Sequence, residues 1–430
     1  MDKDKKIPYK SETIAAKRAI RLAEKIKQTR EIISTRKAWW SNTFLEVFFL
    51  LIVFCINLYH LLPVFGTSSL DVPFSGPVMP LLAKLVAYIF KTQPLMATQS
   101  VSIFFFLVFP FTLYLLVKKI TSRKLVGFTA IFVCTLPIYM FAATRIKEAF
   151  FGLDVSHMAG LSIMPLSLWG LLSFLKEGKI KNMIVAVFSS AVLALTSPFA
   201  FANFLVFAAI FTFSEMLLGQ GRLKLLRSIA VFAFAGGLSS FWYNPAFFVW
   251  MITGPFGEGI RATIAKIVPI SFFTLPILLA FGYLLFDRKP RLQPVFIASF
   301  CTIVFLMVLL TSGGDAFSAT SRYLPELGIS LALLSGVLLT KTVDLIVIKE
   351  MKVLANIGTF LVFSLMFAVT IFNGNKLFED ETNVLGYFTD IQKNELWQAR
   401  DNFGGESQTL GSVITFITLT GLGVLVKKEV

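Results

Sequence analysis

Long apolar segments follow one another along almost the whole chain and constrain its fold more than any other feature. An α-helix needs about 20 predominantly apolar residues to cross the hydrocarbon core of a bilayer. Segments of this kind lie near 43–64, 95–117, 125–143, 157–175, 183–196, 200–217, 228–249, 267–286, 292–311, 325–340, 353–373 and 409–426. With 56% hydrophobic and 15% charged residues, the chain has too little polar surface to enclose such a core in water. The sequence therefore predicts an all-α polytopic membrane protein, a bundle of about twelve transmembrane helices.

The basic residues test this arrangement, because the cytoplasmic connections of membrane proteins are enriched in Lys and Arg. With the N-terminus inside, 30 of the 40 Lys and Arg residues fall in cytoplasmic segments, twelve of them within residues 1–42. We therefore expect an integral membrane protein with both termini in the cytoplasm. The same threading accounts for the formal net charge of +15, so the charge requires no nucleic-acid partner.

The apolar segments divide the chain into a membrane domain and smaller flanking parts. Residues 1–42 are basic and have the periodicity of an amphipathic helix, which we expect to lie on the anionic cytoplasmic leaflet. Residues 43–373 are predicted to form the multi-span domain, 374–408 an external loop, and 409–430 the last transmembrane helix with a cytoplasmic tail. Within the first external loop, segment 78–90 is apolar but too short to span, which predicts an interfacial helix in contact with membrane lipids.

Ionisable residues gather between the third and fourth apolar segments, at the start of the stretch 145–169. Such groups are costly near a bilayer and invite a functional explanation. Asp154 and His157 are three residues apart, so a helix would place them on one face. The pair has the composition of a base with its orienting partner, or of half a metal site. The alternative is an Asp that caps the helix beside an interfacial His.

The other candidate residues lie at the predicted external ends of the spans. The candidates on this side are Asp71, Glu148, Asp154, His157, Glu258, Arg261, Asp315, Arg322 and Glu326, and Arg145 lies in the same external loop as Glu148. A carboxylate such as Asp71, in a loop between prolines, has the chemistry of a general base for an acceptor hydroxyl, or of a solvated loop residue. Arg322 follows several hydroxyl residues and suits a phosphate, although an interfacial Arg is the simpler interpretation. Arg261 and Glu258 have the spacing of a local ion pair.

Metal and nucleotide sites have no sequence signature here. The chain has two histidines and three cysteines without CxxC spacing, so no metal site is predicted. The cytoplasmic loops are short and contain no P-loop, GxGxxG or HExxH motif, which argues against ATP-driven work.

Four short motifs and the span layout resemble the GT-C-type integral membrane glycosyltransferases. The motifs are FGLDVSH at 151–157, PLSLW at 165–169, ALTSP at 194–198 and FWYNP at 241–245. The layout combines a cytoplasmic N-terminus, a long first external loop with an acidic residue, a second acid before the fourth span and an Arg-containing late loop. The resemblance covers about residues 43–340 and is to bacterial multi-span members of this superfamily, which implies a bacterial plasma membrane.

This resemblance implies transfer of a sugar from a polyprenyl-phosphate-type lipid donor to an acceptor on the extracytoplasmic face. It assigns catalytic roles to Asp71, as base, and to Asp154 with His157, which would position the acceptor or an optional divalent cation. It assigns the lipid phosphate to Arg322, with Arg261 and Arg145 as further phosphate-binding candidates. The chain differs from the family pattern in having one acid in its first loop rather than a pair.

Two other classes of function remain open at the level of the sequence. Twelve spans with both ends inside are also the layout of secondary transporters and lipid flippases. Such carriers usually place acidic groups near the midplane, whereas Glu215 and Asp344 lie toward predicted cytoplasmic ends. A non-catalytic assembly partner is the third alternative. The sugar, the acceptor and the oligomeric state are not specified by the sequence.

Overall fold

The computed structural model describes residues 43–62, 76–146, 149–150, 155–254, 258, 261, 265, 282, 292–311, 323–348, 351–373 and 405–429. Within these ranges every regular element is a helix. Contacts divide the chain into two units, Met1–Phe49 and Leu50–Val430. In the first unit the described residues are the beginning of one helix, and the second unit contains all the other helices.

The helices follow one another as the apolar pattern requires. Their bounds are α2 (Thr43–Leu61), α3 (Val78–Phe90), α4 (Pro94–Thr121), α5 (Lys124–Thr135), the π-helical turn η3 (Tyr139–Ala143), α6 (Thr144–Ile146), α7 (Val155–Glu177), α8 (Ile180–Thr196), α9 (Pro198–Leu217), α10 (Gly221–Ser239), α11 (Pro245–Thr253), α13 (Gln293–Thr311), α14 (Leu324–Ile348), α15 (Lys352–Asn373) and α17 (Glu406–Glu429).

Seven helices of the described ranges are long and apolar enough to cross a membrane: α2, α4, α7, α9, α14, α15 and α17. The bent pair formed by α5 with η3 and α6 makes an eighth if it counts as one span, and α3, α8 and α13 are shorter apolar helices. The protein is therefore an all-α polytopic membrane protein. The predicted span 267–286, apart from residue 282, lies outside the described residues, as do residues 1–42, and the number twelve stays a prediction.

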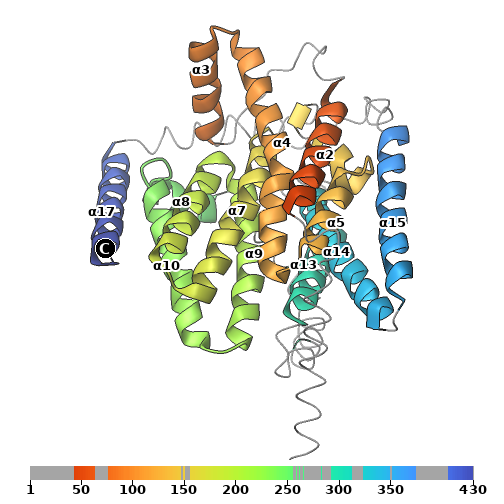
Figure 1. Cartoon of the computed structure of the whole chain (residues 1–430). Helices are drawn as coiled ribbons and strands as arrows, with labels where there is room; N and C mark the ends of the chain where they lie inside the picture. Colours follow the sequence, from red (N-terminus) through yellow and green to blue (C-terminus); the bar gives the residue numbers. More distant parts are fainter. Residues whose placement is uncertain are drawn as a thin grey trace, which may run out of the picture. The chain divides into compact units, whose positions relative to one another are not determined.

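Helix α7 occupies the centre of the second unit, between α4 on one side and α8 and α9 on the other (Figure 1). Most of its residues are buried within the protein, including polar ones such as Ser162, which hydrogen-bonds to the Phe105 carbonyl of α4 at 2.7 Å. Small residues allow this close packing, because a Cβ at Gly170 would lie 2.8 Å from the backbone nitrogen of Ala186 in α8. The site described below lies at the N-terminal end of this central helix.

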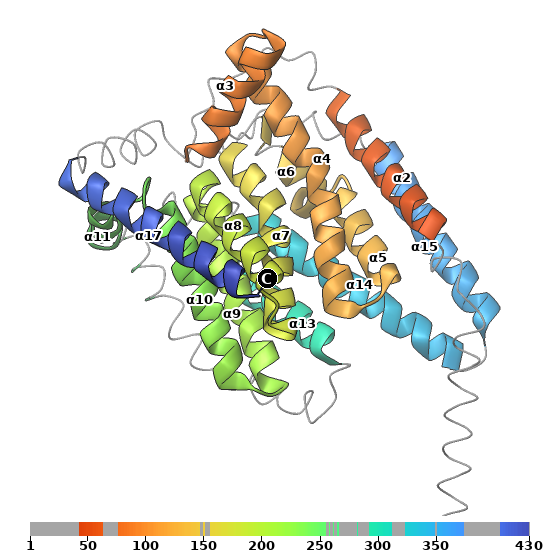
Figure 2. The same ribbon diagram turned by 60° about the vertical axis from the view of Figure 1, so that its left-hand side comes forward.

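Helix α3 has the bounds predicted for the short segment 78–90. Its Met79 and Ala83 are buried, whereas Leu81, Tyr88 and Phe90 are exposed. In Figure 2, α3 lies beside the N-terminal end of α4, with which it packs. A helix with one protein-facing side and one exposed apolar side has the form expected at a membrane interface, and its location in the interface stays a prediction.

The third predicted span, 125–143, is not one continuous helix. Helix α5 ends at Thr135, the chain turns through Leu136 and Pro137, and the following helical segment is bent from α5 by 77°. Proline lacks the N–H that a continuing helix would use and disfavours helix at the residue before it, which explains the break. The bend packs against α14, where a Cβ at Gly328 would overlap the carbonyl oxygen of Met140.

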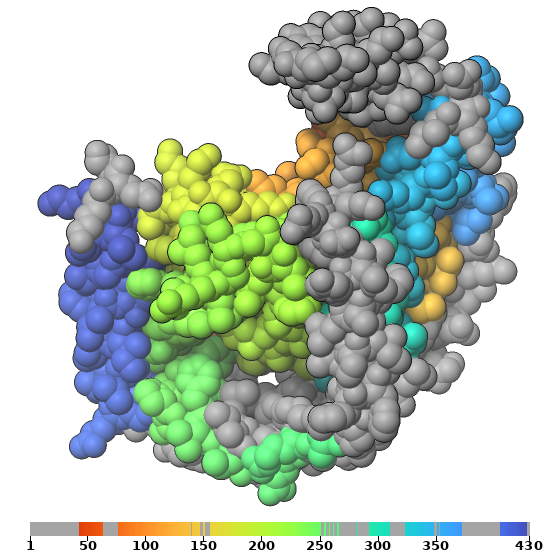
Figure 3. Space-filling view, turned by 90° about the horizontal axis from the view of Figure 1, so that it is seen from below, coloured from red at the N-terminus to blue at the C-terminus, as the bar shows by residue number. Residues whose placement is uncertain are grey.

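The predicted span 228–249 is also divided, whereas the predicted break between the fifth and sixth spans is present. Helix α10 ends at Ser239, and α11 starts after Asn244, whose Oδ1 accepts from the backbone N–H of Phe247 at 2.8 Å. Helices α8 and α9 separate at Ser197, which caps α9. The last helix, α17, lies along α10 (Figure 3), and the Thr415 hydroxyl donates to the Gly237 carbonyl at 2.9 Å.

Candidate functional site

Three polar side chains from three separate helices meet inside the apolar bundle. His157 belongs to α7, Asn203 to α9 and Glu326 to α14. The Nε2 atom of His157 lies 2.8 Å from Oε1 of Glu326, and the Asn203 amide donates to the same oxygen at 2.6 Å. The His and Glu side chains are fully buried, and Asn203 is nearly so. We call these three residues the His157 cluster.

The helices present these groups near their N-terminal ends. His157 and Glu326 are each the third residue of their helix, and Asn203 is the sixth residue of α9. The start of a helix carries partial positive charge from its unpaired N–H groups, which favours a carboxylate such as Glu326 in the first turn. The start of α9 is fixed by Pro198 in the first position and by Ser197, whose hydroxyl accepts from the Ala200 N–H at 3.2 Å.

Aromatic rings cover one side of the cluster. The Phe199 ring meets the His157 ring edge to face, with 4.9 Å between their centroids, and the Tyr323 ring lies 5.1 Å from that of Phe199. Edge-to-face contacts of this kind stabilise a fixed ring orientation. The apolar cover also strengthens the electrostatic interactions beneath it, because the local dielectric constant is low. The imidazole is therefore held in one position in a nearly dry environment.

Only one of the two carboxylate oxygens of Glu326 has a hydrogen-bond partner within the described part of the chain. Both hydrogen bonds go to Oε1, while Oε2 is buried and has no hydrogen-bond partner among the described residues. When Glu326 is ionised its oxygens can only accept, so His157 donates from Nε2 in this contact. A buried carboxylate oxygen without a partner costs free energy, and such groups are concentrated where chemistry or ligand binding requires them.

The segments next to three sequence candidates approach this cluster. Asp71, Asp154 and Arg322 themselves lie outside the described residues. Val155, which follows Asp154, packs with Met79 of α3 and with α4.

The flanks of the other two candidates contact the start of α9. Tyr323, which follows Arg322, lies against Phe199. Gly76, five residues after Asp71, sits so close to the turn between α8 and α9 that a Cβ would overlap the carbonyl oxygens of Leu195 and Thr196. The described flanks of Asp71 and Arg322 therefore reach the region around the start of α9, whereas Val155, beside Asp154, packs toward α3 and α4.

Arg145 differs in surroundings from the sequence expectation, which placed it in an external loop. It is buried, with its guanidinium 4.3 Å from the Phe109 ring centroid and 5.2 Å from that of Phe106, and it donates to the carbonyl of Cys134. That carbonyl lies at the end of α5, where the broken helix leaves acceptors without intrahelical donors. The geometry explains Arg145 as a stabiliser of the helix break, and its predicted phosphate-binding role stays a prediction.

Arg261, the last of the phosphate-binding candidates, is exposed and lies 4.0 Å from the carboxylate of Glu258. This is the local ion pair that the spacing favours. The described part of the chain brings no three His, Cys, Asp or Glu side chains together as metal ligands. The residues described here thus offer no firm site for the optional divalent cation.

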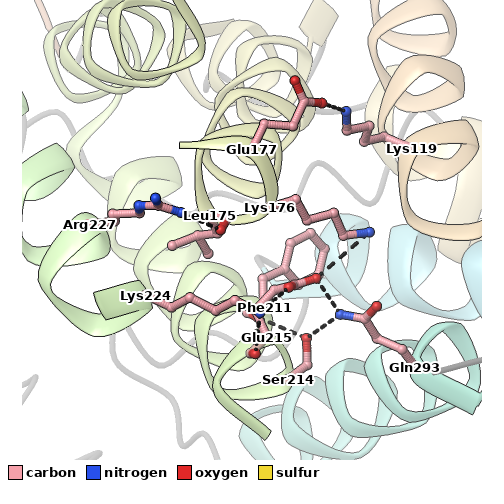
Figure 4. Close-up of polar contacts among 10 residues, drawn as sticks. All are labelled: Lys119, Leu175, Lys176, Glu177, Phe211, Ser214, Glu215, Lys224, Arg227 and Gln293. Atoms are coloured by element: carbon pink, nitrogen blue, oxygen red, sulfur yellow. Dashed lines mark hydrogen bonds and ion pairs between the residues drawn. The ribbon is translucent and has the colours of Figure 1, made fainter. Parts of the chain in front are cut away.

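A second buried carboxylate, Glu215, lies near the C-terminal end of α9, at the opposite end of that helix from the His157 cluster. The Lys224 ammonium donates to Oε2 of Glu215 at 2.9 Å and to its carbonyl at 2.7 Å. The Gln293 amide donates to Oε1 at 2.6 Å, and the Lys176 Nζ lies 3.7 Å from the same oxygen (Figure 4). One carboxylate thus joins α7, α9, α10 and α13.

Sequence reasoning selected His157 but not its partners. Glu326 is 169 positions away along the chain, so no local spacing connects it to His157. Asn203 could have been singled out from the sequence, because an Asn within an otherwise apolar segment is costly unless it has a partner. The predicted partner of His157 was Asp154, whereas the observed hydrogen-bond partner is Glu326.

Comparison with known proteins does not identify a related site. No protein-family model matches the sequence, and no curated protein matches it. The resemblance to GT-C-type enzymes therefore rests on the motifs and the layout alone, and the functional assignment rests on the site.

Proposed function

We propose that this protein is a membrane glycosyltransferase that moves a sugar from a polyprenyl-phosphate-type lipid donor to an acceptor on the extracytoplasmic face. The observation that carries the proposal is the His157 cluster, a buried acid with a histidine and an amide. It lies at the ends of α7, α9 and α14 that the positive-inside threading predicts to face outward.

The depth of the cluster favours an external site over a carrier site. With a rise of about 1.5 Å per residue, His157 and Glu326 lie about 3 Å, less than one helical turn, from the first residue of their helices. The midplane of a bilayer is about 15 Å from the edge of its hydrocarbon core. Carriers usually bind their coupling ions near that midplane. A reactive group within the first turn of the outer end is better placed to meet a lipid headgroup and an external acceptor.

The flanking contacts support a shared site for the sequence candidates. Arg322 is one residue from Tyr323, which packs beside the cluster, and Asp154 is three residues from His157 itself. Asp71 is five residues from Gly76, a reach of at most about 18 Å for an extended chain. These distances along the chain are compatible with one site that contains all three.

In the proposed reaction, the Asp71 carboxylate removes the proton of the acceptor hydroxyl as its oxygen attacks the anomeric carbon. The bond between that carbon and the donor phosphate oxygen breaks, and the phosphate leaves on the lipid. Arg322 stabilises the negative charge that develops on this phosphate. A single displacement of this kind inverts the configuration of the anomeric carbon.

Glu326 and Asn203 act in this scheme through His157. They fix the imidazole orientation, and Phe199 restricts its rotation, so that the ring can position the acceptor or Asp154. The proposal therefore revises one assignment: the orienting partner of His157 is Glu326. Arg145 and Arg261 are not required by the scheme, because one is buried against phenylalanine rings and the other is paired with Glu258.

Turnover of radiolabelled polyprenyl-phosphate sugars by the purified protein in proteoliposomes tests the proposal. Asp71→Asn and Glu326→Gln should each lower turnover by about 100-fold, a size typical of lost base or positioning groups. Glu406→Gln, at the exposed start of α17, is the matched control and should retain full turnover. Unchanged turnover in Asp71→Asn would remove Asp71 from the role of base.

A secondary transporter or lipid flippase is the second candidate, favoured by one observation. A buried His–Glu pair inside a helical bundle has the composition of a proton-coupling group. Such a carrier would move labelled lipid or solute across the vesicle membrane without breaking a glycosidic bond. Transport that depends on Glu326 in vesicles that show no sugar transfer would select this candidate.

A further inference from the structure

The predicted cytoplasmic end of the bundle brings together more lysines than carboxylates, from the nearly buried Lys224 to the exposed Lys179. Glu215 is approached by Lys224 and Lys176, and Glu177 is approached by Lys119 at 2.6 Å and by Lys179 at 3.2 Å. Four ammonium groups thus share two carboxylates, as Figure 4 shows for Lys119, Lys176 and Lys224. We call these four lysines the lysine cluster.

The lysines are close enough to repel one another. Both Lys119 and Lys224 act electrostatically on Lys176, which directly precedes Glu177 in the sequence and lies between the two carboxylates in Figure 4. Lys176 is also the most weakly paired of the four, because its Nζ is 3.7 Å from Glu215, and 30% of its side chain is exposed. An anion at this position would relieve the repulsion without displacing Lys224 from its shorter contact with Glu215.

The surface next to the lysine cluster is apolar. Helix α10 begins with Arg222 and Lys224, and between and after them Leu223, Leu225 and Leu226 are exposed. Arg227 turns back to the bundle and donates to the Leu175 carbonyl at 3.0 Å. Cationic groups beside exposed leucines match a phosphate attached to acyl chains better than a free phosphate, which has no use for an apolar surface.

We propose that the lysine cluster is a binding site for the phosphate of an anionic phospholipid in the cytoplasmic leaflet, with Lys176 as its central contact. The acyl chains lie along the exposed leucines at the start of α10. The site fastens the ends of α7, α9 and α10 to the leaflet that the threading predicts to contact them. It is independent of the proposed glycosyl transfer, since it lies at the other end of α9 from the His157 cluster.

Native mass spectrometry of the full chain, titrated with phosphatidylglycerol or phosphatidylcholine of the same acyl chains, tests this site. We expect phosphatidylglycerol to be retained at lower concentration. Lys176→Gln should weaken its binding about 5-fold, the factor that corresponds to about 1 kcal/mol for one cation near an anionic headgroup. Lys176→Arg, which keeps the charge, should retain binding.

The control is Lys341→Gln, which removes one charge from α14, outside the cluster, and should change phosphatidylglycerol binding by less than about 2-fold. If Lys176→Gln does not fold, Lys119→Gln serves with the same expectation. Equal retention of the two lipids, or equal losses in Lys176→Gln and Lys341→Gln, would overturn the proposal. Displacement of the lipid by equimolar inorganic phosphate would reassign the cluster to a free anion and overturn the lipid assignment.

Discussion

A buried carboxylate lies beside each end of α9, and the two carboxylates differ in how many of their oxygens have partners. Glu215, near the C-terminal end, receives two ammonium groups and an amide, and both of its oxygens are bound. Glu326, on α14 beside the N-terminal part of α9, receives a histidine and an amide on one oxygen only. Glu215 thus holds helices together, whereas Glu326 keeps one buried oxygen without a partner among the described residues.

Free energy explains why the distinction matters. A buried charge costs several kcal/mol unless partners replace its lost water, about 3 to 5 kcal/mol being a typical loss when one partner of a buried pair is removed. Full compensation at Glu215 therefore indicates a structural role. Incomplete compensation at Glu326, in the described part of the chain, indicates a group retained for function. The following substitutions test this comparison.

The largest effect is expected for Glu215→Ala, which leaves Lys224 and Lys176 close together without their carboxylate. The free energy of unfolding should fall by about 3 to 5 kcal/mol, visible as a lower midpoint in thermal unfolding of the detergent-solubilised protein. Glu177→Ala is the matched control, because this carboxylate is exposed and its removal should leave the midpoint close to that of the wild type. Equal shifts in both variants would contradict the structural role of Glu215.

Asn203→Leu should have a smaller effect on stability and a clear effect on activity. The substitution removes one of two donors to Glu326, which should cost about 1 to 3 kcal/mol of unfolding free energy and lower turnover about 10-fold. The control is Asn57→Leu in α2, where the Asn amide donates only to the Val53 carbonyl of its own helix among described residues. A loss of turnover in Asn57→Leu as large as in Asn203→Leu would show that turnover does not depend specifically on the His157 cluster.

Gly76→Ala tests whether the first external loop must approach the start of α9. An added Cβ would overlap the carbonyls of Leu195 and Thr196, so the loop end has to move outward. Turnover should fall about 10-fold, since small displacements of positioning groups reduce rates strongly, while the thermal midpoint changes little. Gly358→Ala, where the added Cβ meets open space, should keep full turnover. Equal turnover in the two variants would show that the approach is not needed.

The smallest effect is expected for Arg123→Gln at the predicted cytoplasmic surface. Arg123 contacts both oxygens of Asp344 at 2.6 and 2.7 Å, yet its side chain is half exposed. An exposed pair is typically worth between about 0 and 1 kcal/mol, so the thermal midpoint should hardly change. A loss as large as that of Glu215→Ala would mean that burial does not set the strength of these pairs.

Much of the helix layout could be predicted because hydrophobic length and local breakers are local properties. The segment 78–90 became α3, and the break at Thr196, Ser197 and Pro198 lies between α8 and α9. Two predicted spans, 125–143 and 228–249, are each divided into separate helical segments. Their signals were present as Pro137 and Pro245, but hydropathy alone is continuous across both.

The candidate site could be predicted only in part, because its partners come from distant helices. An ionisable residue at the start of a bilayer-length apolar segment points to His157 from the sequence alone, whereas the contact with Glu326 depends on how α7 and α14 pack. The same limit applied to Glu215, which the sequence placed at a cytoplasmic helix end without its partners Gln293 and Lys224. Local spacing finds groups on one helix, and tertiary packing selects which of them meet.

The role of the His157 cluster is tested most directly by turnover per folded protein for Glu326→Gln and Glu215→Gln side by side, with a polyprenyl-phosphate sugar as donor. We expect Glu326→Gln to keep a thermal midpoint near that of the wild type and to lose about 100-fold in turnover. For Glu215→Gln we expect the reverse, a lower midpoint with wild-type turnover in the folded fraction. Wild-type turnover in folded Glu326→Gln would contradict the central role of the His157 cluster.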